Sequence, residues 1–358
     1  MAEPLTPQNQ PAANVAAKPG RRWLKATAWT AAGLVTLAVG TTGALWWWAG
    51  TEGSLAQGLG WVSKSQPLTF KQATGSLRAG GHIDELRWQQ DGLTVDARDV
   101  SLAWQPWSLL QGTLKLDRFA AAGIEVTDVR PPSPTPATPP NALGLPLRIA
   151  LDEFSIGQFR LAGKTAFTAS EIAGNYAYTG LAHQLDLKSL TLDKGRYSGR
   201  AALTAASPLT LDASLSGTLD AAIPNGAASV PLAVQATAKG ALTELLVKAE
   251  LQVTAVAPGE QKPSEQPQAS ATARVMPWAA QPLPQADATF RDLDMAALLP
   301  DMPQTLLTGS ASVRPLEASA PVDAGAPSSV LQAWALQLKL VNALPGPWDQ
   351  KRLPLEQL

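Results

Sequence analysis

The side chains that could carry out chemistry are few in this sequence and lie far apart. There is no cysteine, and the two histidines, His82 and His183, stand about a hundred positions from each other. The pairs Asp84–Glu85 and Asp292–Asp294 resemble the two carboxylates of a glycoside hydrolase, but acids so close in polar turns are usually solvated. Phosphate-binding loops, zinc-binding helices and nucleophile elbows have no counterpart here. We therefore predict a protein that is not an enzyme and needs no metal or cofactor.

A basic group in the segment "GRYSGRAAL" offers a second kind of chemistry. Arg196, Tyr197 and Arg200 are close enough in sequence to hold a phosphate headgroup together. The alternative is that they are solvated on the outer face of a sheet, as exposed basic residues usually are. The formal net charge of the whole chain is −1, so no extended phosphate backbone is expected as a partner and nucleic acid is excluded.

The N-terminal part of the chain contains a long apolar segment. No charged residue occurs from Ala26 to Thr51, and as a helix this segment would measure roughly 39 Å, against about 30 Å for the hydrocarbon core of a bilayer. Arg21, Arg22 and Lys25 precede the segment and Glu52 follows it. By the positive-inside rule, the N-terminus is expected in the cytoplasm and the bulk of the chain in the periplasm.

Three consecutive tryptophans, Trp46, Trp47 and Trp48, lie where this helix would leave the lipid, and indole rings favour that level of a membrane. We predict a single-pass signal anchor over residues 21–51 that holds the protein in the inner membrane. Residues 1–20 are predicted to be a disordered tail. An unusual cleaved signal peptide is the alternative, although the apolar run is too long for one and lacks a good cleavage site.

Beyond the anchor, apolar and polar residues alternate with a period of two, which is typical of strands with one buried face. The pattern is clearest in "LTLDASLSGTLD", "ELLVKAELQV" and "WALQLKL", where only Leu246 breaks it. The residues that would share the apolar face are Leu209, Leu211, Leu215, Val247, Leu251, Leu336 and Leu338. Gly-marked breaks at roughly ten-residue spacing indicate a meander of about 25 strands and not a chain of strands and helices.

Several local signals interrupt the strands. Proline-rich or alanine-rich stretches at 130–141, 257–270 and 317–329 cannot form central strands and are predicted to be surface loops or insertions. The alternation slips by one residue between Ala97 and Val100, which requires a turn or a bulge. Short helices are expected only at 55–62, 106–112 and 294–301.

Longer stretches of the chain carry a resemblance to a known family. The succession from Gly75 to Val126, beginning "GSLRAGGHIDELRWQQDGLTVDARDV", resembles the N-terminal region of the TamB family, inner-membrane subunits of the translocation and assembly module of Gram-negative bacteria. Downstream, "LPLRIALDEFSIG", "HQLDLKSLTLDKGRYSGRAALTAASPLTLDASLSG" and "NALPGPWDQKRLPLEQL" resemble the same family.

The resemblance implies an AsmA-like, bridge-type lipid transporter, mostly β, in which a transmembrane helix precedes an elongated antiparallel sheet curled into an open groove over residues 52–358. Such proteins carry phospholipid toward the outer membrane, or help to assemble outer-membrane proteins with a β-barrel partner, TamA. Family members are several times longer than this chain. We therefore expect this chain to be an N-terminal portion, with any contact with TamA made through a region beyond Leu358.

Alternation by itself leaves a second architecture open. The same apolar faces would serve equally well as the core of one or two closed sandwiches or barrels, in which each half-buried strand packs against protein. The resemblance favours the open groove. A lipid conduit and an assembly scaffold both remain possible functions at this point.

Overall fold

The computed structural model describes residues 40–130, 138–163, 166–193, 195–222, 229–253, 267–279, 281–298, 302–315 and 334–358. The chain divides into two compact units, Met1–Thr51 and Glu52–Leu358. In the first unit, residues 40–49 are helical, and most of the predicted anchor at 21–51 lies outside the described residues. Among the residues that are described, no helix has both the length and the apolar character needed to cross a membrane.

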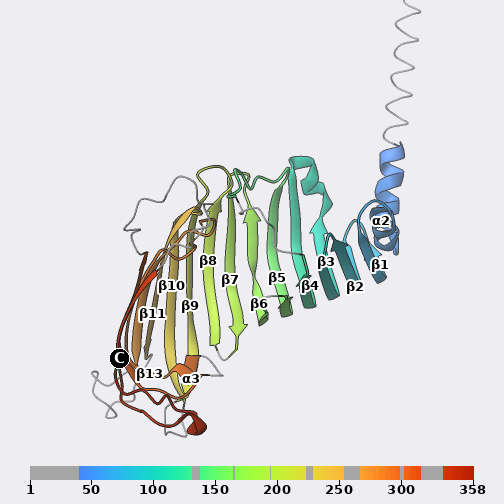
Figure 1. Cartoon of the computed structure of the whole chain (residues 1–358). Helices are drawn as coiled ribbons and strands as arrows, with labels where there is room; N and C mark the ends of the chain where they lie inside the picture. Colours follow the sequence, from blue (N-terminus) through green and yellow to red (C-terminus); the bar gives the residue numbers. More distant parts are fainter. Residues whose placement is uncertain are drawn as a thin grey trace, which may run out of the picture. The chain divides into compact units, whose positions relative to one another are not determined.

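In the part of the chain that the structure describes, the second unit is built on one sheet of 15 strands, whose order in space is the order in sequence (Figure 1). Its helical elements are α2 (Ser54–Val62), η1 (Pro106–Gln111), α3 (Met295–Leu298) and η3 (Trp348–Gln350). The strands are β1 (Leu68–Ser76), β2 (Gly80–Gln90), β3 (Leu93–Gln105), β4 (Thr113–Asp128), β5 (Arg148–Ala162), β6 (Phe167–Tyr178), β7 (Ala182–Leu192), β8 (Gly195–Thr204), β9 (Thr210–Ala222), β10 (Ser229–Ala241), β11 (Glu244–Val253), β12 (Gln268–Val275), β13 (Gln285–Leu293), β14 (Leu307–Pro315) and β15 (Trp334–Asn342).

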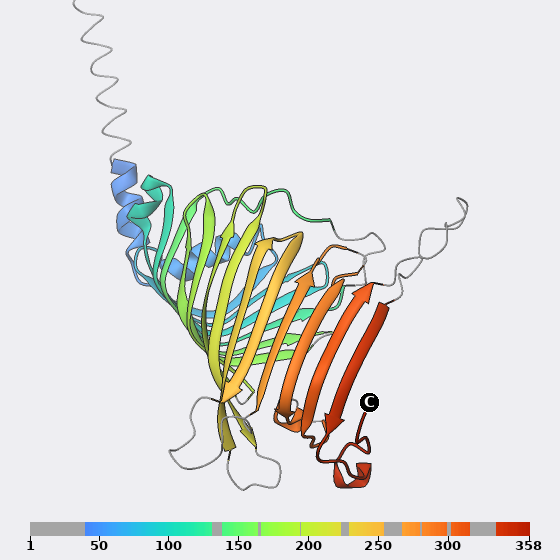
Figure 2. The ribbon, with the colours of Figure 1, turned by 90° about the vertical axis from the view of Figure 1, so that its left-hand side faces the viewer.

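The sheet is open and strongly curled (Figure 2). Fifteen strands at about 4.8 Å correspond to roughly 70 Å along the sheet. The described residues form 15 strands and not the predicted number of about 25. Strands of up to 16 residues and long connections such as residues 129–147 take up more of the chain than about twelve residues for each strand and turn. The meander itself is confirmed.

One pairing departs from the expected antiparallel meander. β4 and β5 are parallel, and all other neighbours are antiparallel. The chain therefore crosses from one end of the strands to the other through residues 129–147, which include the whole of the predicted proline-rich interruption at 130–141. We call the strand ends that carry η1 and the β6–β7 turn the upper rim, and those that carry the β2–β3 turn and α3 the lower rim (Figure 1).

A line of bulges crosses β1 to β6. Gln72, Asp99 and Glu171 have left-handed φ angles of 41°, 51° and 51°, and the regular pairing breaks beside each of them. Because a bulge adds one residue to a strand, the inward-facing residues on its two sides are three positions apart, as with the buried Ala97 and Val100. The predicted phase slip in β3 is thus a bulge, and its counterparts in the neighbouring strands went unnoticed in the sequence.

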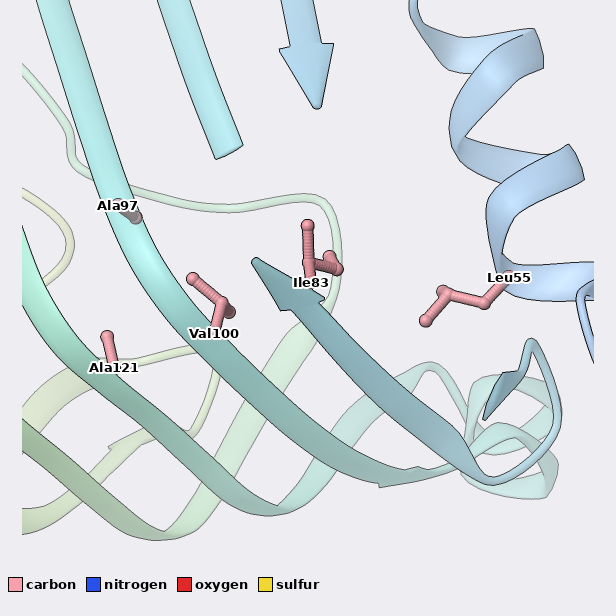
Figure 3. Close-up of a cluster of buried hydrophobic side chains, with 5 residues drawn as sticks. All are labelled: Leu55, Ile83, Ala97, Val100 and Ala121. Atoms are coloured by element: carbon pink, nitrogen blue, oxygen red, sulfur yellow. The ribbon is translucent and has the colours of Figure 1, made fainter. Parts of the chain in front are cut away.

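At the N-terminal end of the sheet, α2 covers the concave side. Leu55 of α2 belongs to one buried cluster with Ile83, Ala97, Val100 and Ala121, and Figure 3 shows Leu55 facing Ile83. A Cβ atom at Gly81 would meet the Leu55 side chain, so the absence of a side chain there lets the helix approach. The short helix expected at 55–62 is confirmed, despite its two glycines.

At the other end, the C-terminal segment covers β13 to β15. Leu355 packs with Leu293, Leu307 and Leu340. The buried Asn342 accepts hydrogen bonds from the backbone N–H groups of Leu306 and Leu344, both at 3.1 Å, and its Nδ2 donates to two backbone carbonyls at positions 353 and 355. This end of the sheet therefore has a small core with a buried polar anchor.

Next to this core, the buried carboxylate of Asp294 accepts from the backbone N–H groups of Ala296 and Thr305 at 3.1 and 3.0 Å. Burial raises the pKa of Asp294, while these two hydrogen bonds act in the opposite direction. Asp294 thereby begins α3, as the acidic cap in the sequence predicted.

The turn predicted over residues 106–112 is η1, and Leu246 points away from the apolar face and is exposed, as its break in the alternation indicated. The interruption predicted over 257–270 ends too late, because β12 begins at Gln268 and pairs with β11. Residues 317–329 lie outside the described residues.

Candidate functional site

One face of the sheet is apolar from strand to strand. Residues directly paired across a sheet project from the same face. Starting at Leu102 of β3, each registered partner in turn is apolar as far as β15. The row consists of Leu102, Phe119, Phe154, Gly174, Leu187, Gly199, Leu215, Ala236, Ala249, Ala271, Ala288, Ala311 and Leu338.

We call this face the inner face, because it is the one that α2 and Leu355 cover at its two ends and it lies inside the curl. Parallel rows repeat the pattern on either side. Val247, Ala273, Ala286, Val313 and Leu336 form part of one such row.

The opposite, outer face is polar by the same test. The row next to that of Leu215 consists of Asp186, Arg200, Ser214, Thr237, Lys248, Thr272, Asp287, Ser312 and Gln337. Ion pairs between neighbouring strands lie on this face, among them Lys239 with Asp212 at 3.2 Å and Arg314 with Asp287 at 2.6 Å. The two faces are therefore chemically distinct over the greater part of the sheet.

The seven residues predicted to line a groove fall on the inner face or at its margin. Leu211, Leu215, Val247, Leu251, Leu336 and Leu338 all belong to its rows, and Leu209 is buried immediately before β9. The structure thus brings together residues from β9, β11 and β15, which are up to 127 positions apart in the sequence. Whether these residues hold lipid stays a prediction.

Between its two covered ends, the inner face is covered only at its margins among the described residues. The crossover lies over it at the upper rim, where His183 contacts Leu143, and α3 contacts β9 at the lower rim. Leu211, Ala213 and Leu215 are only half-buried on a strand whose outward residues are exposed, and Leu336 near the β15 edge retains 65% of its exposure. In the central row, the residues from β10 to β14 are all alanines, which leave the floor of the curl shallow and smooth. The architecture is an open groove with an apolar floor and not a closed sandwich or barrel.

The two histidines have structural partners. His183 Nε2 donates to the carbonyl oxygen of Leu143 at 2.9 Å, and its Nδ1 accepts from the Tyr176 hydroxyl at 2.7 Å. Tyr178 stacks on the same ring with centroids 4.6 Å apart. These contacts fasten the crossover between β4 and β5 above the inner face at the upper rim. Sequence reasoning missed this role, because the crossover partner lies 40 residues away.

The other histidine lies near the line of bulges. His82 contacts Ser101 at 3.0 Å and Asp84 at 3.2 Å.

The possible phosphate site in "GRYSGRAAL" is divided by the sheet. Tyr197 pairs with Gly217 on the inner face, whereas Arg196 and Arg200 project from the outer face. Arg200 lies 4.0 Å from Asp186, and Arg196 borders a hollow of about 580 Å³ together with Lys188 and Glu171. The three residues therefore do not form one headgroup site.

The predicted membrane-interface residues are partly described. Trp46, Trp47 and Trp48 occupy the last turn of the first unit's helix, which ends where the N–H and hydroxyl groups of Thr51 both donate to the carbonyl oxygen of Trp48. Trp47 is exposed. Arg21, Arg22 and Lys25 lie outside the described residues, so the predicted anchor stays a prediction.

Comparison with known proteins gives one family. No curated protein and no solved structure matches the chain. Residues 41–144 match the family described as "TamB, N-terminal domain". The match takes in β1 to β4 and ends in the crossover, a few residues before β5 begins. It therefore confirms the resemblance found in the sequence: residues 41–144 are similar to the N-terminal domain of the TamB family.

Proposed function

We propose that this protein is an inner-membrane-anchored bridge that carries phospholipid through the periplasm toward the outer membrane, with acyl chains lying on the inner face and no catalytic step. The observation that supports this most directly is the apolar inner face, which is continuous from β3 to β15 and whose middle is covered only at the two rims among the described residues. An apolar surface of this size on a protein in water calls for a partner.

The energetics favour acyl chains as that partner. Removing a methylene group from water contributes about 0.8 kcal/mol, so one chain of about 15 methylenes would contribute on the order of 12 kcal/mol before the cost of ordering it. The alanine floor of β10 to β14 offers a smooth apolar bed, and the polar outer face keeps the other side of the sheet hydrated. In this proposal the anchor at residues 21–51 holds the chain in the inner membrane with its N-terminus in the cytoplasm.

The first test is lipid content and its dependence on the inner face. The full chain is purified in mild detergent, and bound phospholipid is measured by mass spectrometry for wild type, Leu211→Asp and Leu215→Asp. The matched control is Ser216→Asp, one residue along β9 but on the outer face. We expect at least a severalfold loss of lipid in the two inner-face variants and none in the control.

Folding must be followed in the same samples by circular dichroism. In an open groove a new carboxylate at position 211 or 215 faces water, whereas in a closed core it would unfold the chain. Wild-type protein free of lipid, or equal lipid in Leu215→Asp and Ser216→Asp, would contradict the proposal.

A second function, assembly of outer-membrane proteins, is favoured by a different observation. Among the described residues, β15 is the last strand of the open sheet. Along its free edge, only the end at Leu340–Asn342 is paired, with the C-terminal residues. An exposed strand edge can accept a further strand from a client protein. The proposed role would be that of a scaffold acting with a β-barrel partner of the TamA type.

Cysteine cross-linking separates the two functions, because the chain has no cysteine of its own. A cysteine at Gln337 on β15 should capture nascent outer-membrane proteins in cells if the edge receives client strands. A cysteine at Gln235 on β10, paired on both sides, is the control. Equal capture at both positions would argue against the scaffold.

A further inference from the structure

The upper rim of the sheet exposes large apolar side chains in the elements that connect its strands. In η1, Trp107 and Leu110 retain 60% and 79% of their exposure, and Leu181 in the β6–β7 turn retains 82%. Leu147, at the start of β5, is also exposed, and it lies beside η1 because the N–H of Arg148 donates to the carbonyl of Gly112 at 3.0 Å. These residues belong neither to the inner face nor to any of the buried clusters.

The same rim receives the chain from the predicted anchor. At the start of α2, Ser54 Oγ accepts from the N–H of Leu77 at 3.0 Å, and the carbonyl of Leu77 accepts from Trp104 Nε1 at 2.7 Å. η1 begins two residues after Trp104. The first residue of α2 and the exposed residues of η1 therefore lie on one rim, joined through the β1–β2 turn.

The segment that joins the predicted anchor to α2 is short. Only Glu52 and Gly53 separate Thr51 from Ser54, and three consecutive peptide units reach about 10 Å at most. If residues 26–51 span the bilayer, the start of α2 is held within that distance of the membrane surface.

We propose that the upper rim around η1 is a membrane-docking edge, with Trp107, Leu110 and Leu181 inserted among the headgroups of the bilayer that holds the anchor. Tryptophan and leucine gain most at this level, because the apolar part of the side chain leaves water while the indole N–H keeps a polar partner. Arg148, which also lies on this rim, would meet the anionic lipid surface. This inference rests on the proposed anchor, but it does not require that the groove carry lipid.

Docking would have a geometric effect that the anchor alone does not provide. A single helix would hold the chain to the bilayer at one point only, whereas a second contact through η1 would fix one rim against the lipid. The open side of the groove would then begin at the headgroup level, where acyl chains can enter.

Depth-dependent fluorescence quenching tests the proposal on the full chain. Single cysteines at Leu110 and Leu181 are labelled with a polarity-sensitive fluorophore, and the protein is reconstituted in vesicles of phosphatidylethanolamine and phosphatidylglycerol. Val129 is the matched control, because it is an equally exposed apolar residue, at 72%, but lies at the lower rim beyond the 16 residues of β4. We expect blue-shifted emission and strong quenching by nitroxide-labelled lipid at 110 and 181, and neither at 129.

Two further measurements make the outcome decisive. The double variant Trp107→Glu/Leu110→Glu should abolish quenching at position 181 while the chain still floats with the vesicles. The proposal of a docking edge would be overturned by equal quenching at positions 110, 181 and 129, or by no quenching at 110. It would also be overturned if quenching at 181 were unchanged in the double variant, or if the chain did not float with the vesicles. Bound phospholipid, measured on the same preparations, reports on the groove independently, so a failure of lipid carriage is distinguishable from a failure of docking.

Discussion

At the scale of single residues, the packing of the inner face depends on glycines, which leave room for the side chains of neighbouring strands. Tyr197 of β8 lies across from Gly217 of β9, and a Cβ atom at Gly217 would overlap both the Tyr197 ring and the Arg196 carbonyl. Burial raises the pKa of the Tyr197 hydroxyl, which is consistent with a ring pressed against the sheet. The glycine therefore makes room for an aromatic side chain that covers the backbone.

Gly217→Ala should consequently destabilise the protein by about 1–3 kcal/mol, the usual range for overfilling a packed site. The measurement is chemical denaturation followed by tryptophan fluorescence. Ser216→Ala, on the outer face of the same strand, is the control and should change stability by less than about 0.5 kcal/mol. A neutral effect of Gly217→Ala would mean that Tyr197 is free to move away.

A second residue, Asp294, links stability to pH. Burial raises its pKa in the folded chain, so the folded state binds this proton more tightly than the unfolded state does. The contribution of this group to stability is therefore greatest at a pH below the unfolded value and declines as the pH rises through the raised folded pKa. Asp294→Asn keeps an oxygen acceptor for Ala296 and Thr305 but removes the buried charge.

We expect Asp294→Asn to lose less stability than wild type between pH 4 and pH 7, in thermal melts monitored by circular dichroism. Asp294→Ala, which leaves two backbone N–H groups without their acceptor, should be less stable than wild type at both pH values. Parallel pH profiles for wild type and Asp294→Asn would show that the carboxyl is solvated.

At the scale of the elements, the line of bulges across β1 to β6 is the feature that sequence reasoning found least completely. The slip between Ala97 and Val100 was recognised in β3. The same three-residue spacing of inward apolar residues occurs at Ile83 and Leu86 in β2 and at Ile156 and Phe159 in β5. Comparing the spacing in successive strands would have located the whole line.

Other parts of the fold were less accessible to the sequence. Period-two alternation predicted which residues share a face in β9, β11 and β15, because that property is local. The parallel pairing of β4 with β5 depends on the route of the crossover, and the alternation of the two strands is the same in either direction. The covering of the inner face by α2 and by Leu355 also depends on contacts between distant parts of the chain. The sequence therefore predicted the apolar residues of the face but not the segments that pack on them.

The bulge in β3 leads to a prediction about a backbone angle. Asp99 is exposed and has a φ of 51°, a conformation that costs a β-branched residue roughly 1–2 kcal/mol and glycine almost nothing. Asp99→Gly should therefore be neutral or stabilising, whereas Asp99→Val should destabilise by about that amount, as measured by denaturant titration. If both variants behave alike, the left-handed residue is not required for the bend.

At the scale of the whole molecule, stability is distributed unevenly along the sheet. The two main buried clusters lie at its ends, under α2 at β1 to β4 and under the C-terminal segment at β13 to β15. In β7 to β9 the inner residues are mostly half-buried, so the hydrogen-bond ladder there has less side-chain packing behind it. Local opening is easiest where few buried apolar contacts must be broken.

Hydrogen exchange should therefore show strong protection in β2, β3 and β14 and weaker protection in β7 to β9 of lipid-free protein. Addition of phospholipid should slow exchange selectively in the middle strands, because acyl chains would supply the missing layer. Mass spectrometry of peptic peptides resolves these regions. Protection that is uniform along the sheet, or unaffected by lipid, would indicate that the middle is already closed.

The antiparallel pairing from β5 onward has a consequence for how such a groove can change its length. From β5 onward every neighbouring pair is antiparallel, so the chain returns to the same rim after each hairpin. Inserting or deleting one hairpin in this region leaves the direction of every other strand unaltered and moves no turn from one rim to the other. Evolution or protein engineering can thus adjust the span in increments of about 10 Å without disturbing the rim at which η1 lies.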